Sequence, residues 1–186
     1  METYSDEKLA ILAAKNNKEA LETLVARYLK LVYSFVFRYA RNQQDAEDIT
    51  QEIFVKVWRN LRKFDQSKTF RPWLYKIAKN TCLDFLKKKP LVSFSGLNGI
   101  ENTEWLAQNL ASASPSPEIS LDQTLLKNEF AAAIKKLSPK YAETLSLHQE
   151  QGLNFREIAE ATQESQNTVK SRYRRALIKL KQLLSK

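Results

Sequence analysis

The sequence has little of several residue types that whole classes of protein require. It contains one cysteine, Cys82, and one histidine, His148, among 186 residues. A single cysteine excludes an internal disulfide and a thiolate zinc cluster, and a single histidine excludes a multi-histidine metal site. The chain has three glycines, whereas phosphate-binding loops need glycine where the backbone approaches phosphate closely. The composition therefore disfavours a disulfide scaffold, a zinc module and an α/β enzyme built on a glycine-rich loop.

Long apolar runs are missing as well. No run of 18 apolar residues occurs, so no transmembrane helix is expected. The first seven residues, Met1–Glu7, are acidic and lack the basic-then-apolar pattern of a signal peptide. We therefore expect a cytoplasmic protein with no membrane insertion of its own. A hydrophobic fraction of 43% is enough for a globular core, and the length allows one or two small domains.

Positive charge is abundant but unevenly placed. The chain carries 30 Lys and Arg residues against 21 Asp and Glu residues, which gives a formal net charge of +9. Residues 1–90 have a net charge of +7, residues 91–126 of −4 and residues 127–186 of +6. Excess positive charge is typical of proteins that bind a polyanion such as nucleic acid. Two basic modules therefore flank an acidic connector.

The connector also differs from both modules in composition. The stretch from Pro90 to Pro117 holds three of the five prolines and two of the three glycines, which is typical of a linker with little regular structure. We expect domains at residues 1–90 and 122–186, joined by an acidic linker at residues 91–121. A purely entropic spacer needs no apolar residues, so part of the linker is expected to dock on another surface. These apolar residues are Leu91, Val92, Phe94, Ile100, Trp105 and Leu106.

The first module has a helical pattern throughout. From Glu19 onward, apolar residues recur at steps of three and four, and a second long helix is expected to begin with Asp45 as its N-cap. The core stripe of that second helix is expected to comprise Ile49, Ile53, Val57, Leu61 and Phe64. Another side is lined by Asp48, Gln51, Glu52, Lys56 and Arg59. On the pattern alone, this polar row is a solvated helix face.

A third helix of the first module is expected to open near Pro72, which suits a first turn because it lacks an N–H, and to end near Lys89. From Arg71 to Lys89 there are six basic residues and one acid, with aromatic residues interleaved. This mixture fits single-stranded DNA, because cations follow the phosphates while each ring stacked on a base contributes roughly 1–3 kcal/mol. The alternative is that Phe70 and Trp73 belong to the core and that the lysines only keep the helix soluble.

The second module is helical too. Asp122 can cap one helix, and Pro139 opens a second one that Gly152 ends. The following stretch, residues 154–175, has the pattern of a helix-turn-helix, with Ser165 as the N-cap of its second helix. The buried stripe of that helix is expected to comprise Val169, Tyr173, Ala176, Leu177 and Leu180.

The exposed first turns of this last helix carry side chains suited to DNA. A recognition helix places its N-terminal residues against base edges in the major groove. Asn and Gln can read adenine, Arg can read guanine, and further cations hold phosphates. The candidate duplex-contacting residues are Ser165, Gln166, Asn167, Thr168, Lys170, Ser171, Arg172 and Arg175. The alternative is a basic amphipathic helix without base readout.

Both modules, in this order, resemble a bacterial RNA polymerase sigma factor of the extracytoplasmic-function (ECF) group. The resemblance rests on residues 45–58 (DAEDITQEIFVKVW), 70–81 (FRPWLYKIAKNT) and 153–175. It implies an all-α fold in which a sigma region two helical bundle and a sigma region four helix-turn-helix are joined by a flexible linker. The implied function is to direct RNA polymerase core to specific promoters and to initiate transcription, with no catalytic residue, metal ligand or cofactor.

The resemblance also implies roles for individual residues. Binding of the polymerase core falls to Asp48, Gln51, Glu52, Lys56, Trp58 and Arg59. Capture of the single-stranded promoter −10 element falls to Phe70, Arg71, Trp73, Tyr75, Lys76, Lys79, Asn80, Leu83 and Lys87. Recognition of the −35 duplex falls to the duplex-contacting residues of the last helix given above. An anti-sigma factor, which would hold the chain near the membrane, is a further implied partner.

The expected promoter sets a length that the chain must span. Elements about 17 base pairs apart lie roughly 58 Å apart at about 3.4 Å per step. A linker of about 30 residues reaches at most about 100 Å when fully extended. As a free coil it would span roughly 30 Å. The linker can therefore bridge the two elements if it is held extended, a task that the polymerase would perform.

One departure from the family pattern and two alternative functions need to be stated. The turn between the last two helices reads Thr162-Gln163-Glu164, where the family usually has a Leu-Gly-Ile-like turn, so Gln163 must adopt a backbone shape that glycine adopts easily. A stand-alone helix-turn-helix regulator that binds duplex DNA is the alternative function, although it does not explain residues 70–89. An enzyme is a distant third, because His148 is expected on a helix surface and the acids around Asp45 are explained by capping.

Overall fold

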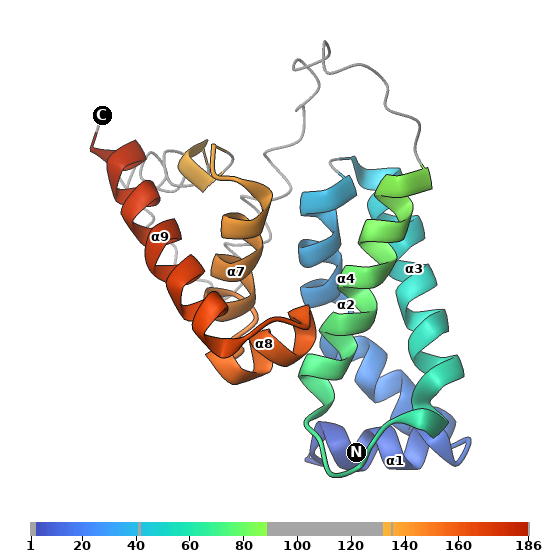
Figure 1. Ribbon diagram of the computed structural model, residues 1–186. Helices are drawn as coiled ribbons and strands as arrows, with labels where there is room; N and C mark the ends of the chain where they lie inside the picture. Colours follow the sequence, from blue (N-terminus) through green and yellow to red (C-terminus); the bar gives the residue numbers. More distant parts are fainter. Residues whose placement is uncertain (1–2, 41, 89–131, 135, 186) are drawn as a thin grey trace, which may run out of the picture. The chain divides into compact units, whose positions relative to one another are not determined.

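The computed structural model describes residues 3–40, 42–88, 132–134 and 136–185. Within these ranges every regular element is a helix, which confirms the predicted all-α fold (Figure 1). The described residues within Met1–Pro90 and Ser146–Val169 form one compact unit, and those within Leu91–Leu145 and Lys170–Lys186 form a second. The helix expected after Asp122 and the expected docking of the linker lie outside the described residues. The domain boundaries at residues 90, 121 and 122 stay a prediction.

Three long helices form the centre of the first unit. They are α2 (Lys18–Ala40), α3 (Gln43–Asn60) and α4 (Phe70–Lys88), and each packs against the other two. The expected stripe of α3 is buried at Ile49, Ile53 and Val57. A short 3₁₀ helix, η1 (Leu61–Lys63), leads from α3 toward α4. The apolar periodicity of the first module is therefore confirmed as the source of its core.

Helix α3 begins earlier than the sequence indicated. Its N-cap is Asn42, whose side-chain oxygen accepts a hydrogen bond from the backbone N–H of Asp45 at 2.9 Å. The prediction that Asp45 is the N-cap was therefore wrong, since Asp45 lies in the first turn. Asn is as good an N-cap as Asp, so the preference for the acid over the amide had no physical basis. A carboxylate in the first turn still interacts favourably with the helix dipole.

A short helix that the sequence analysis did not anticipate precedes these three. Helix α1 (Asp6–Ala14) is capped by Ser5 and buries Leu9, Ala10 and Ala13. Its acidic first turn reaches two other helices. Asp6 accepts hydrogen bonds from Arg27 and from the hydroxyl of Tyr28 on α2, and the Glu7 carboxylate accepts one from the backbone N–H of Phe70 at 3.1 Å. Helix α1 thus fixes the start of α4, where N–H groups lack intrahelical partners.

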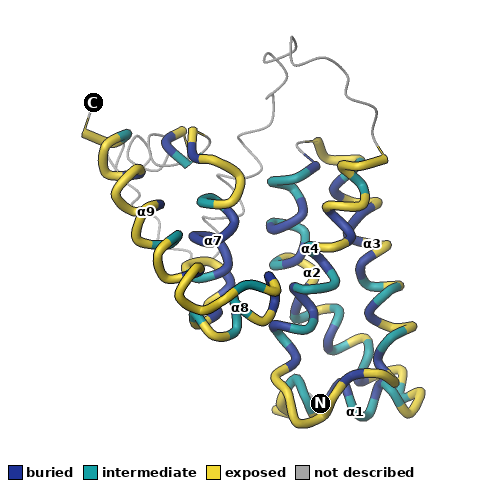
Figure 2. The backbone as a smooth tube through the Cα atoms, in the orientation of Figure 1, coloured by how far each residue is buried: buried dark blue, intermediate teal, exposed yellow. Residues whose placement is uncertain are grey.

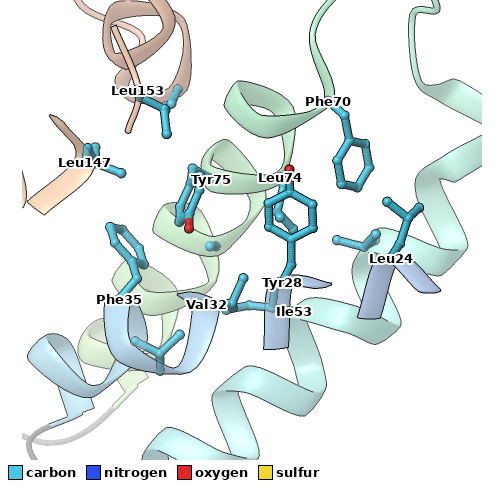
Figure 3. Close-up of a cluster of buried hydrophobic side chains, with 14 of the residues drawn as sticks. Leu24, Tyr28, Val32, Phe35, Ile53, Phe70, Leu74, Tyr75, Leu147 and Leu153 are labelled. Carbon is cyan, nitrogen blue, oxygen red and sulfur yellow. The ribbon is translucent and has the colours of Figure 1, made fainter. Parts of the chain in front are cut away.

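An aromatic cluster lies where α2 and the start of α4 meet. The Phe70 ring lies 5.6 Å from that of Tyr28 and 5.8 Å from that of Phe64, and the Trp73 ring lies 5.2 Å from Phe64, as centroid distances. Figure 3 shows Phe70 and Tyr28 among buried aliphatic side chains. Burial raises the pKa of Tyr28 above its ordinary value, and the Asp6 carboxylate adds to this. The phenol is therefore a neutral hydrogen-bond donor.

The helix-turn-helix expected near the C-terminus is present. Helix α8 (Phe155–Thr162) has Asn154 as its N-cap in a capping box with Glu157. Gln163 adopts the left-handed conformation with φ 58° and ψ 41°, as the turn required, and its N–H bonds back to α8 carbonyls. Helix α9 (Gln166–Leu184) follows, and the hydroxyl of Ser165 accepts from the N–H of Thr168 at 3.1 Å. The predicted cap and turn are both confirmed.

The second unit has a small apolar core of its own. It is made by Ala133, Leu137, Leu145, Ala176 and Leu180. Leu145 lies on α7 (Pro139–Gln149), the helix that the sequence predicted to open at Pro139. The expected stripe of α9 is buried at Val169, Ala176 and Leu180, whereas Leu177 is 42% exposed. The prediction of a buried Leu177 was wrong, because a step of one residue from Ala176 turns it about 100° away from the stripe.

The described residues contain no helix long and apolar enough to cross a membrane.

Candidate nucleic-acid interface and partner surface

Helix α4 divides its predicted DNA-binding residues between buried and exposed sides. Phe70 is 1% exposed and Tyr75 has no exposed surface. Neither ring presents a face on which a base can stack in this structure. Phe70 belongs to the aromatic cluster, as the alternative interpretation of the sequence held. A role for either ring in DNA binding stays a prediction.

The exposed side of α4 carries a different subset, which we call the open face: Lys76, Asn80, Leu83 and Lys87. These residues recur at steps of four, three and four, so they share one side of the helix. Asn80, Leu83 and Lys87 are exposed and Lys76 is half-buried. Lys79 is also half-buried and lies at the edge of this face. The open face combines cations, an amide and one apolar side chain.

Two further residues of the predicted set are engaged inside the first unit. The Arg71 guanidinium donates to the backbone carbonyl of Gln151, and Trp73 packs on Phe64 and Phe70. The Tyr75 hydroxyl donates to the side-chain carbonyl of Gln151. Burial raises the pKa of Tyr75 above its ordinary value, while Arg71 and Arg38 act against this. Tyr75 is therefore a neutral donor to a buried amide.

Helix α3 presents the predicted polymerase-binding residues on its outer side. Asp48, Gln51, Glu52 and Arg59 are all exposed, in agreement with the polar row of the sequence. Lys56 is half-buried. Its ammonium group lies 2.7 Å from the Glu52 carboxylate and donates to the Thr81 hydroxyl on α4 at 3.2 Å. Lys56 thus links α3 to α4 rather than pointing outward.

One apolar residue on this side of α3 was missed from the sequence. Val55 is 42% exposed and lies between the polar positions, three residues after Glu52 and four before Arg59. We call Asp48, Gln51, Glu52, Val55 and Arg59 the α3 face. An apolar residue at a polar position of the helical repeat was the available signal. Single exposed apolar residues are common on protein surfaces, so Val55 is informative only together with the exposed Trp58 three residues later.

Trp58 lies beside the α3 face and is 55% exposed. It borders two shallow hollows of about 190 and 310 Å³, both of which also touch Ala13 and Asn16 at the end of α1. Arg59 and Arg62 line one hollow, and Lys18 and Leu21 line the other. A large exposed ring beside hollows is typical of an anchor residue in a protein–protein interface.

Helix α9 exposes most of its predicted duplex-contacting residues, and Figure 2 shows it exposed along most of its length. The exposed members are Ser165, Gln166, Asn167, Thr168, Lys170, Ser171 and Arg175, and Arg172 is half-buried. Ser165 uses its hydroxyl as the cap, so its first role is structural. Val169, the buried residue among them, faces the interior.

The sequence analysis left Arg174 out of the duplex-contacting residues of α9. Arg174 is exposed and follows Asn167 by seven residues and Ser171 by three, so it lies on the same side of the helix. This side is opposite the buried stripe. We call Asn167, Ser171, Arg174 and Arg175 the α9 face. The heptad step from Asn167 was the signal that could have found Arg174.

His148, the histidine of the sequence, has a structural role. The Nδ1 atom of His148 lies 2.8 Å from the carbonyl oxygen of Leu153, and its ring stacks on Phe155 with centroids 4.7 Å apart. His148 therefore joins the end of α7 to the start of α8. Among the residues that the structure describes, no group of three or more His, Cys, Asp and Glu side chains is placed to hold a metal ion.

Comparison with protein-family models identifies both modules. Residues 24–90 match the model of sigma-70 region 2, and residues 127–180 match that of sigma-70 region 4. The first match includes the α3 face and α4, and the second includes the helix-turn-helix. The α1 helix precedes the first match.

Individual relatives match over nearly the whole chain. The ECF RNA polymerase sigma-E factor of Escherichia coli K12 is 32% identical over 184 residues, covering 94% of this chain and 92% of that protein. The ECF sigma factor SigW of Bacillus subtilis is 31% identical over 163 residues and covers 87% of both chains. Sigma factor NccH of Alcaligenes xylosoxydans is 31% identical over 180 residues, with coverage of 96% and 94%.

Solved structures share the fold. CnrH, in complex with the cytosolic domain of CnrY, has a TM-score of 0.69 at 24% identity and covers 97% of both chains. The sigma factor RpoE of Bartonella quintana, in complex with the anti-sigma factor NepR, has a TM-score of 0.63 at 21% identity, covering 88% of this chain and 96% of that one. With two region models in order and relatives above 30% identity along most of its length, the chain belongs to the ECF group of RNA polymerase sigma factors.

Proposed function

We propose that this promoter-directing sigma factor works through three separate surfaces and performs no chemistry of its own. The α3 face and Trp58 bind the polymerase core, the open face of α4 captures the unpaired −10 strand, and the α9 face reads the −35 duplex. The observation that carries the proposal is the distribution of exposed side chains. Cations outnumber acids on α4 and α9, whereas the α3 face carries two acids and one cation, Arg59, with Val55 among them and Trp58 beside them.

Capture of the −10 strand follows from the chemistry of the open face. Lys76 and Lys87 lie three helical turns apart and can follow successive phosphates of an extended strand. Asn80 lies between them with donors and an acceptor for a base edge. Leu83 is 38% exposed and offers an apolar contact for an unpaired base. A base in a duplex keeps its faces stacked and its Watson–Crick edge paired, so only an unpaired base can offer a face to Leu83 and that edge to Asn80.

Reading of the −35 element follows from the position of the α9 face. Its residues lie opposite Val169 and Ala176, which anchor the helix from behind. The side that enters a major groove is the one opposite the anchor. Asn167 can read adenine and Arg174 or Arg175 can read guanine, each bidentate pair contributing about 1–3 kcal/mol of discrimination. Lys170, at the side of the helix, suits a phosphate.

The polymerase partner fits the α3 face and its neighbour. Asp48 and Glu52 supply negative charge on a chain with an overall net charge of +9, so the partner surface is expected to be positive there. Trp58 and Val55 supply apolar area that such an interface would bury. A stand-alone helix-turn-helix regulator explains these surfaces less well, because duplex binding by α9 alone needs neither the α3 face nor the open face of α4.

We also propose an anti-sigma partner and action in the cytoplasm. Two structurally similar proteins were solved bound to other proteins, CnrH with the cytosolic domain of CnrY and the sigma factor RpoE with the anti-sigma factor NepR. This chain shares their fold. A pull-down from native cells, followed by identification of the bound proteins, tests for the polymerase and an inhibitor together.

Reconstituted transcription with polymerase core tests the core-binding surface and the −10 surface separately. Trp58→Ala is expected to weaken core binding, while Asn80→Ala is expected to leave core binding intact and to reduce open-complex formation. Lys8→Ala removes an exposed cation of α1 outside all three surfaces and is the matched control. If no promoter in a genomic library gives a start-site-specific product with this chain, the proposed function is wrong.

A further inference from the structure

The ammonium group of Lys56 lies between α3 and α4, away from the α3 face. Its side chain is 36% exposed, and its Nζ atom lies 2.7 Å from the Glu52 carboxylate and 3.2 Å from the Thr81 hydroxyl on α4. Figure 1 shows α3 and α4 side by side, and the two helices are in contact. An ammonium group has three donors. Its contacts with described residues engage two of them, which leaves one for a ligand.

Thr81 places this ammonium group next to the open face of α4. Thr81 is 2% exposed, and its hydroxyl donates to the Ile77 carbonyl at 2.9 Å, so its oxygen can accept from Lys56. It directly follows Asn80, in the middle of the open face. A step of one residue turns by about 100° around a helix, so Thr81 lies on the side of the open face that borders α3. Lys56 therefore lies at that border.

Within the described residues of α4, the open face carries cations only at its two ends. Lys76 and Lys87 are eleven residues apart, which is about 16 Å along the axis at about 1.5 Å per residue. Between them the open face has an amide and an apolar side chain, and Lys79 lies at the edge away from α3. Thr81 is near the middle of this stretch. Lys56 therefore supplies a cation where a strand that follows the open face would pass further phosphates.

The border between the open face and α3 would be acidic without Lys56. Glu52 is exposed on the α3 side, and Asp84, three residues after Thr81 on α4, is exposed as well. Asp84 also attracts a cation of the open face, since the Lys87 ammonium group lies 3.8 Å from its carboxylate. Two carboxylates at this border would repel a phosphate backbone. Lys56 is placed to offset that repulsion.

We infer that Lys56 is a strand-binding residue that α3 contributes to the −10 surface, and that it does not belong to the polymerase-binding surface. Its ammonium group binds a phosphate of the unpaired strand beside Asn80. Glu52 and Thr81 hold the ammonium group in place before the strand arrives, so it loses less conformational freedom on binding than a lysine without partners. The inference deepens the proposed function and rests on the assignment of −10 capture to α4.

The salt dependence of strand binding tests this role. The probe is a fluorescein-labelled non-template strand from a promoter that the reconstituted polymerase transcribes, titrated with polymerase core that is saturated with this chain. Lys56→Met is expected to lower the salt slope by about 0.7, the loss of one phosphate contact, and to weaken strand binding about threefold or more. Binding to the core is expected to stay unchanged. Lys30→Met removes an exposed cation of α2 outside all three surfaces and is the matched control.

Two further variants separate a phosphate contact from a structural link. Thr81→Val keeps nearly the same shape and removes the hydroxyl that joins α4 to Lys56, so the salt slope is expected to stay at its original value. Lys56→Arg keeps the charge and is expected to retain the slope as well. Denaturant unfolding measures the stability of each variant. An unchanged slope in Lys56→Met overturns the inference: weaker core binding would then make Lys56 a polymerase contact, and an equal loss of stability in Thr81→Val would make it a structural link.

Lys87→Ala in the same titration distinguishes this inference from the proposed function. If Lys87→Ala lowers the salt slope and Lys56→Met does not, the inference is wrong and −10 capture by α4 stands. If neither variant lowers the slope, the −10 role of the open face is wrong as well. A lower slope in both variants supports the inference and the −10 role together.

Discussion

Helices α4 and α9 both supply cations for the proposed DNA contacts, yet they are built in different ways. Helix α9 is anchored along one stripe, with Val169 and Ala176 fully buried, and most of its remaining surface is exposed. Helix α4 is covered on two sides, by the bundle core at Phe70 and Leu74 and by residues 146–169 of the same unit at Tyr75. The comparison teaches that residue type agrees with exposure on a helix with one buried side and departs from it on a helix with two.

The largest expected effect is the loss of stability on replacing Phe70, on the buried side of α4. Phe70→Ala removes a ring from the aromatic cluster and is expected to lower the free energy of unfolding by about 3–5 kcal/mol. Denaturant unfolding measures this loss. Leu83→Ala, on the open face of the same helix, is expected to change stability by no more than about 0.5 kcal/mol. A fully stable Phe70→Ala chain that fails at the −10 element would instead make Phe70 a DNA contact.

On α9 the same comparison predicts a loss of selectivity without a loss of stability. Arg175→Ala is expected to weaken binding to a matched −35 duplex by about 1–3 kcal/mol and to relax the preference at one base pair. Competition binding with single-base variants of the duplex measures both quantities. Arg156→Ala, an exposed cation at the start of α8, is the control for charge alone. An unchanged order of duplex preference would argue against base reading by Arg175.

The exposed side of α4 differs from its buried side in a second measurable way, the salt dependence of single-strand binding. Lys87→Ala is expected to reduce open-complex formation several-fold and to lower the salt slope of single-strand binding by about 0.7, the loss of one phosphate contact. Titrations at several salt concentrations, with polymerase core present, provide the slope. Core binding itself is expected to stay unchanged. Equal losses in core binding and open-complex formation would count against a −10 role for this residue.

The smallest expected effect concerns the turn that places α9. Gln163 has a left-handed backbone conformation, which costs an L-residue roughly 1–2 kcal/mol. Glycine avoids this cost, but it loses more conformational entropy on folding, which offsets part of the gain. Gln163→Gly is therefore expected to raise the free energy of unfolding by about 0.5–1 kcal/mol. Thermal unfolding measures the shift. The matched change Gln166→Gly, in the first turn of α9, is expected to be destabilising, and stabilisation by both would point to a different cause.

The sequence predicted the helical fold and the helix-turn-helix because periodicity and capping are local. Ser165 and Gln163 behave as their neighbours required. Helix α1 was missed because its three buried residues are small or adjacent and give no one-sided pattern. The N-cap was assigned to Asp45 instead of Asn42 because both residue types cap equally well.

The candidate sites were predictable only in part, for a different reason. The polar residues of the α3 face were found because a polar row on an amphipathic helix is exposed by default, whereas Val55 was missed. Tyr75 and Arg71 were grouped with the open face because their partner, Gln151, lies 76 and 80 residues away. Contacts at such separations leave no periodic trace in either stretch of sequence, so the burial of Tyr75 beside Gln151 could not be anticipated.

The reach of α1 matters to anyone who would shorten this protein. A fragment trimmed to the family boundary at residue 24 would discard Glu7, which is the acceptor for the first N–H of α4. Arg27 and Tyr28 would lose their hydrogen bonds to Asp6. The apolar residues of α2 would lose the packing of Leu9 in the shared core and become exposed. Such a fragment would contain the region 2 sequence with α2 and the start of α4 destabilised. Weak DNA binding by it would then result from the truncation and would not report on promoter preference.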